Sequence, residues 1–110
     1  MKKIIAVDFD GTLCEHVYPE IGEPKKEVLD WIYEQQRQGA KIILWTCREG
    51  FELKKAIDWC RDQGLIFDAI NENIPELKNR EFGIRKPYAD IYLDDRAMDL
   101  SMFQAKAMNE

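Results

Sequence analysis

Residues 3–13, Lys-Ile-Ile-Ala-Val-Asp-Phe-Asp-Gly-Thr-Leu, are the most informative part of the sequence for the fold. It opens with a short apolar run rich in β-branched residues, Lys3 to Val7, which predicts a buried strand. Two aspartates and a glycine follow, so we expect a sharp turn directly after the strand. Because alternate side chains of a strand share a face, Asp8 and Asp10 can both reach one small volume if the turn keeps that spacing.

The rest of the chain alternates between helical and extended patterns. The expected elements are a loop over 13–24 that can hold a small hairpin, helices over 25–38 and 49–63, strands over 40–45 and 65–70, an irregular stretch over 71–89 with a helical turn or two near 76–80, a strand over 91–93, and a closing helix over 97–108. This alternation predicts an α/β fold with a small parallel sheet and right-handed crossovers.

Length and charge limit what the protein can be. The chain has 110 residues, which fits one domain over 1–110 and leaves no room for a second lobe. A formal net charge of -5 argues against broad binding to nucleic acid or to an anionic membrane, although a phosphorylated nucleic-acid end can still be a substrate. No apolar run approaches 18 residues, and the N-terminus does not resemble a signal peptide.

The cysteines and the histidine narrow the chemistry further. Cys14, Cys47 and Cys60 have no CxxC spacing, so we expect reduced thiols and a cytoplasmic protein. His16 is the only histidine, which excludes a multi-histidine metal site and argues against a Ser-His-Asp triad. We interpret His16 as a loop residue.

Polar side chains follow three of the expected strands at the point where each strand ends. These are Asp8 and Asp10 after the first strand, Thr46 and Arg48 after the second, and Asp94 and Asp95 after the fourth. In a parallel sheet these ends meet at one edge, where ligands bind. Clustered carboxylates repel one another, and a hard cation relieves the repulsion, so the cluster predicts Mg²⁺ together with a phosphorylated ligand.

Two carboxylates of this kind can divide the work of phosphoryl transfer. One can attack phosphorus and the other can protonate the leaving oxygen, while the Thr46 hydroxyl contacts a phosphate oxygen and a lysine neutralises charge. Here the sequence resembles the haloacid dehalogenase superfamily. The resemblance rests on Asp8-Phe9-Asp10-Gly11-Thr12, Leu44-Trp45-Thr46, Lys86-Pro87 and Tyr92-Leu93-Asp94-Asp95, which match its four motifs in order over nearly the whole chain.

That resemblance implies a three-layer Rossmann-like sandwich and a set of roles. Asp8 is the nucleophile that forms an aspartyl-phosphate, and Asp10 is the general acid and then the base. The Mg²⁺ ligands are the Asp8 carboxylate, the Asp10 backbone carbonyl and the acidic pair, with Asp95 favoured over Asp94. The residues expected to contact substrate are Gly11, Thr12, Thr46, Cys47 and Arg48. Lys86 is the expected active-site lysine, with Lys78 as its competitor, and Asp99 is a candidate outer-shell partner.

A finer resemblance concerns Thr46-Cys47-Arg48 and the stretch 86–97. The first is similar to the phosphatase half of phage-type polynucleotide kinases, and the second to small phosphatases encoded near capsule-synthesis genes. This implies that Arg48 holds substrate phosphate through its planar fork. Lys86 lies only eight residues before Asp94, so it reaches the site only if 87–89 run down the sheet before 91–94 run up.

The chain departs from many superfamily members by lacking room for a cap domain. We therefore expect an open site, or one that a partner subunit covers, and a substrate that is a phosphorylated small molecule or a phosphorylated macromolecular end. The expected function is Mg²⁺-dependent phosphomonoester hydrolysis. The alternatives are a non-catalytic, receiver-like regulatory module, a metal-dependent nuclease, and a phosphotransferase of the same fold.

Overall fold

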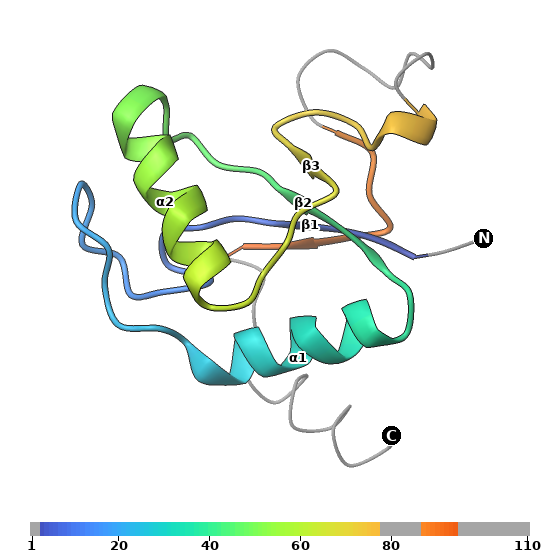
Figure 1. Cartoon of the computed structure of the whole chain (residues 1–110), viewed down its shortest axis with the longest axis horizontal. Coiled ribbons are helices and arrows are strands. Elements are labelled where there is room, and N and C mark those ends of the chain that lie inside the picture. Colours follow the sequence, from blue (N-terminus) through green and yellow to red (C-terminus); the bar gives the residue numbers. More distant parts are fainter. Residues whose placement is uncertain (1–2, 78–86, 95–110) are drawn as a thin grey trace.

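The computed structural model describes residues 3–77 and 87–94, and a four-stranded parallel sheet forms its centre (Figure 1). The strands are β1 (Ile4–Val7), β2 (Lys41–Leu44), β3 (Ala69–Ile70) and β4 (Ile91–Leu93), in the order β3-β2-β1-β4. Every pairing is parallel, and the register joins Val7 to Leu44 on one side and to Leu93 on the other. β1 is buried along its whole length, as its apolar run predicts.

Two helices, α1 (Lys26–Arg37) and α2 (Gly50–Asp62), pack on one face of the sheet. The buried side chains of α1 recur at helical spacing, at Val28, Leu29, Trp31, Ile32 and Gln35. They share a core with alternate residues of the two central strands and with Ala56 and Cys60 of α2. The opposite face carries a second core beneath the 3-10 turn η1 (Pro75–Leu77) and Ala89. The predicted α/β fold with a small parallel sheet is confirmed.

The strand order places a topological switch point at β1. From β1 the chain moves outward to β2 and then β3, whereas β4 pairs with the other side of β1. In open parallel sheets a crevice forms beyond the carboxyl ends of the strands at such a point. The residue at that point is Asp8, which directly follows β1.

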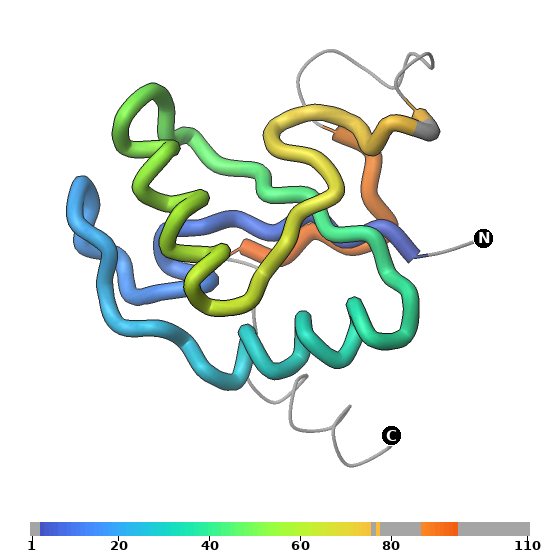
Figure 2. Tube along the Cα trace, viewed as in Figure 1, coloured from blue at the N-terminus to red at the C-terminus, as the bar shows by residue number. Residues whose placement is uncertain are grey.

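Some elements are shorter than expected. The strand predicted over 65–70 is observed only at Ala69–Ile70, and the Leu65 N–H instead donates to the Cys60 carbonyl at the end of α2. The loop over 13–24 does form a small hairpin, in which the Glu15 N–H donates to the Glu23 carbonyl at 2.8 Å. Figure 2 shows this loop leaving β1, running beside α2 and returning to α1.

Several expectations fall on residues outside those that the structure describes. They concern Lys78, Lys86, Asp95, Asp99 and the closing helix over 97–108. No helix in the described ranges is long and apolar enough to cross a membrane.

Candidate active site

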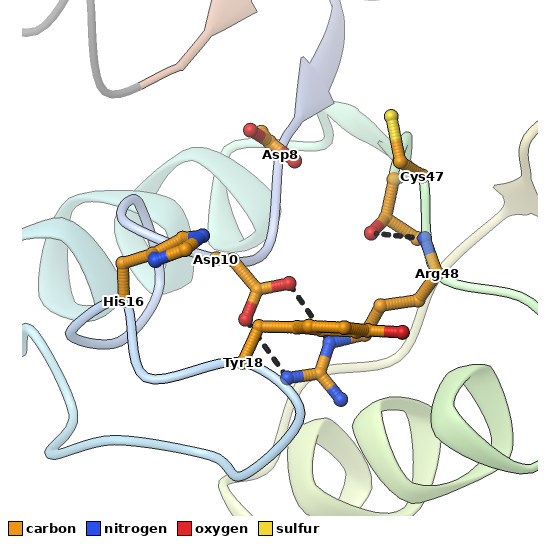
Figure 3. Close-up of a pocket in the computed structure, with 7 residues that line it drawn as sticks. Asp8, Asp10, His16, Tyr18, Cys47 and Arg48 are labelled. Atoms are coloured by element: carbon orange, nitrogen blue, oxygen red, sulfur yellow. Dashed lines mark hydrogen bonds and ion pairs between the residues drawn. The ribbon is translucent and has the colours of Figure 1, made fainter.

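A cavity of about 390 Å³ opens at the carboxyl edge of the sheet. Its walls come from three segments: the end of β1, the loop over 13–24, and the segment between β2 and α2 (Figure 3). The lining residues are Asp8, Asp10, His16, Tyr18, Thr46, Cys47 and Arg48. The sequence predicted this convergence for Asp8, Asp10, Thr46, Cys47 and Arg48 but not for the two aromatic side chains of the loop.

Asp8 is held at the centre of this edge by the sheet itself. Its N–H donates to the Leu93 carbonyl at 2.9 Å, and one carboxylate oxygen accepts the Phe9 N–H at 2.8 Å. The register pairs Val7 with Leu93, so Asp94 follows β4 at the position beside Asp8. Neighbouring strands lie about 4.8 Å apart, which brings the two acids to adjacent positions on one edge.

The turn after Asp8 uses the backbone amides of Gly11 and Thr12 internally. Gly11 adopts φ +83° and its N–H donates to the Cys14 carbonyl, while the N–H groups of Thr12 and Leu13 donate to the Phe9 carbonyl. Gly11 and Thr12 are buried, and neither lines the cavity. Their amides are used within the turn, and the predicted contact of these two residues with substrate stays a prediction. Their role is to turn the chain so that Asp10 faces the cavity beside Asp8 (Figure 3).

Arg48 makes all its contacts within the protein. Its side chain is 1% exposed, and it pairs with Asp10 through two parallel hydrogen bonds of 2.8 Å, from Nε to Oδ2 and from Nη2 to Oδ1. Its remaining N–H groups donate to the backbone carbonyls of Pro19, Glu20 and Glu52. All five donors of the guanidinium are therefore used within the protein. In this arrangement no N–H of Arg48 is left for the substrate phosphate that the resemblance implies it holds.

Aromatic rings enclose the Asp10–Arg48 pair. The guanidinium carbon lies 4.9 Å from the centre of the Phe9 ring and 5.0 Å from that of Tyr18. In Figure 3 the Tyr18 ring lies across the pair at the cavity wall. The hydrogen bonds from Arg48 to Asp10 raise the pKa of Arg48 above its ordinary value, which outweighs the opposing effect of burial. The guanidinium therefore stays charged beside Asp10.

Thr46 and Cys47 lie across the cavity from the loop. The Thr46 N–H donates to the Asn71 side chain at 2.8 Å, which ties the end of β2 to the end of β3. The Thr46 hydroxyl accepts the Arg48 N–H at 3.2 Å, so its own proton can be donated to a ligand. Cys47 is exposed, in contrast to the buried Cys14 and Cys60. Both Thr46 and Cys47 thus occupy positions from which they can contact a substrate, and that role stays a prediction.

His16 and Tyr18 are the lining residues that sequence reasoning missed. Both belong to the loop over 13–24, and each is exposed to solvent. Nothing in the local pattern marks them, because the loop is folded onto the site by the hydrogen bonds from Arg48 to the Pro19 and Glu20 carbonyls. The only signal in the sequence was that a lone histidine and a tyrosine stand a few residues after the acidic turn.

The chemistry of the donors at this edge suits Mg²⁺. Asp8 and Asp94 follow adjacent paired strands and offer the oxygen ligands that this ion prefers. Within residues 3–77 and 87–94, no group of three or more His, Cys, Asp or Glu side chains is gathered closely enough to hold a metal. Asp95, the favoured ligand, lies outside those ranges, so the magnesium site stays a prediction that the described donors fit.

The path of the chain just before β4 bears on whether Lys86 can reach the site. The Tyr88 N–H donates to the Asn73 side chain, beyond the end of β3, whereas the Asp90 N–H donates to the carbonyl of Ile4 at the start of β1. The chain therefore descends along the sheet before it ascends in β4. This is the path that Lys86 requires, although Lys86 itself lies outside the described residues.

Comparison with known proteins gives one informative relative. No protein-family model and no curated protein matches the chain. A solved structure, that of a conserved protein from Bacteroides thetaiotaomicron, is 37% identical over 100% of this chain and 93% of its own, with a TM-score of 0.81. No activity is stated for that protein.

Proposed function

This chain belongs to the same family as the conserved Bacteroides thetaiotaomicron protein, and we propose that it is a magnesium-dependent phosphomonoesterase of the haloacid dehalogenase type. One observation carries the proposal. Asp8 lies at the carboxyl end of β1, at the topological switch point of the sheet. Asp10 lies two residues further on and lines the same cavity. Two carboxylates at such a point suit a nucleophile and a proton carrier.

In this mechanism Asp8 attacks phosphorus and the bond to the leaving oxygen breaks, which forms an aspartyl-phosphate. Asp10 gives its proton to that oxygen. Asp10 then accepts a proton from a water molecule that attacks phosphorus, which releases inorganic phosphate and restores Asp8.

Other side chains would support the transferred group. The Thr46 hydroxyl can donate to a non-bridging phosphate oxygen, and Lys86 would neutralise charge beside it. Asp8, the Asp10 backbone carbonyl, Asp94 and Asp95 would hold Mg²⁺, which supplies electrostatic stabilisation of the phosphate charge when bound. The free thiols support the cytoplasm as the compartment.

The mouth of the cavity is open to solvent, which bears on the size of substrate that the site can accept. The pocket walls that the structure describes come from short loops, and His16 and Tyr18 at its mouth are exposed. Such an open site accepts the phosphorylated end of a large molecule as readily as a small phosphomonoester.

Hydrolysis of an aryl phosphate tests the proposal. We expect turnover with Mg²⁺, none with EDTA, and none from Asp8→Asn, which keeps the shape of the side chain but removes the nucleophile. An Asp8→Asn protein with full activity would refute the mechanism. Stable phosphorylation of Asp8 without turnover would instead favour the receiver-like alternative, and transfer to an added alcohol would favour a phosphotransferase.

A further inference from the structure

Arg48 joins three segments that surround the cavity. Its guanidinium bonds to Asp10, to the loop at Pro19 and Glu20, and to the first turn of α2 at Glu52. These three segments are joined at one buried side chain. A group with this set of partners can fix geometry, but it has no N–H left to offer a ligand.

We infer that Arg48 is a positioning residue, which aims the Asp10 carboxylate into the cavity and anchors the loop that carries His16 and Tyr18. The inference rests on the proposed function, because it assigns Arg48 an effect on proton transfer by Asp10. The two parallel 2.8 Å hydrogen bonds fix both the place and the plane of that carboxylate. The rings of Phe9 and Tyr18 lie against the guanidinium.

A positioning residue and a phosphate ligand differ in which kinetic constant they control. Loss of a phosphate ligand weakens the binding of substrate and of inorganic phosphate. Loss of alignment lowers kcat and leaves these affinities unchanged. We therefore expect Arg48→Lys, which keeps the charge but not the planar fork, to lower kcat by about 10- to 100-fold. KM and the inhibition constant of inorganic phosphate should change by less than about two-fold.

A double-mutant cycle tests whether Arg48 acts through Asp10. In the Asp10→Asn background the carboxylate is already gone, so Arg48→Lys should lower the residual kcat by less than about three-fold. A full additional loss in that background would overturn the inference, as would a ten-fold rise in KM and in the phosphate inhibition constant. Arg61→Lys is the matched control, because Arg61 is exposed and pairs with Asp58 at the far end of α2. It should leave both constants unchanged.

A second measurement uses the wild-type protein and needs no turnover, so it also separates failure of this inference from failure of the proposed function. Phenylglyoxal should modify the exposed Arg37 and Arg61 and spare Arg48, and inorganic phosphate should not change that pattern. Modification of Arg48 that phosphate prevents would overturn the inference even if Arg48→Lys fails to fold. Wild-type protein that does not hydrolyse an aryl phosphate would instead count against the proposed function.

Discussion

A substitution at Gly22 tests whether the hairpin of the loop over 13–24 shapes the active site. A Cβ atom built on Gly22 would lie 2.4 Å from the carbonyl oxygen of Glu15 and 2.9 Å from its Cβ. The nearest atom belongs to the backbone, so no side-chain rotation relieves the clash. Gly22→Ala must push the two sides of the hairpin apart.

The structure sets the scale of the effect. Separation of the two sides breaks the hydrogen bond from the Glu15 N–H to the Glu23 carbonyl, which costs about 1 kcal/mol. Steric strain from an inserted methyl group adds about 1–3 kcal/mol. Gly64→Ala is a matched control, because Gly64 has φ +86° and open space around it, so alanine there costs only about 1 kcal/mol of backbone strain.

Urea unfolding and aryl phosphate kinetics measured on both variants decide the matter. We expect Gly22→Ala to lose about 2–4 kcal/mol of unfolding free energy and to lower kcat/KM, because His16 and Tyr18 move with the hairpin. Gly64→Ala should lose less unfolding free energy than Gly22→Ala and should keep the wild-type kcat/KM. If Gly22→Ala is as stable and as active as Gly64→Ala, the reasoning about the hairpin is wrong.

Two further predictions concern the thiols. Burial raises the pKa of both the Cys14 and the Cys60 thiol, so iodoacetamide at neutral pH should label Cys47, which is exposed, and spare the other two; peptide mass spectrometry that finds equal labelling would contradict this. For Cys60 the pKa rises from about 9 to about 12, so its contribution to stability is complete below pH 9 and is lost as the pH rises toward 12. The unfolding free energy of the wild-type protein, measured with urea, should therefore fall by about 2 kcal/mol by about pH 10.5, and that of Cys60→Ala should not show this loss. Parallel pH profiles for the wild-type protein and Cys60→Ala would refute the prediction.

The central part of the fold could be predicted because its signals are local. An unbroken apolar run at β1 that ends in Asp8 fixes a buried strand with an acid at its end, and the helices around Val28 and Ala56 show clear apolar periodicity. The order of the strands then brings Asp8, Thr46 and Asp94 to the same edge without any knowledge of side-chain contacts.

The finer details of the site depend on contacts between distant segments, and there the sequence was insufficient. The role of Arg48 is decided by the carbonyls of Pro19 and Glu20, which lie 29 and 28 residues away along the chain. The same contacts bring Tyr18 to the cavity. Gly11 and Thr12 were placed at the substrate by resemblance, whereas the turn uses their amides internally.

The central claim is that Asp8 carries the phosphoryl group, and trapping that intermediate tests it most directly. In Asp10→Asn the group that activates water is absent, so we expect the aspartyl-phosphate to form with an aryl phosphate and Mg²⁺ and then to persist. Intact-mass analysis should show the addition of one phosphoryl group, and peptide mapping should place it on Asp8. Phosphorylation of another residue, or the same mass increase in a protein that also carries Asp8→Asn, would contradict the account.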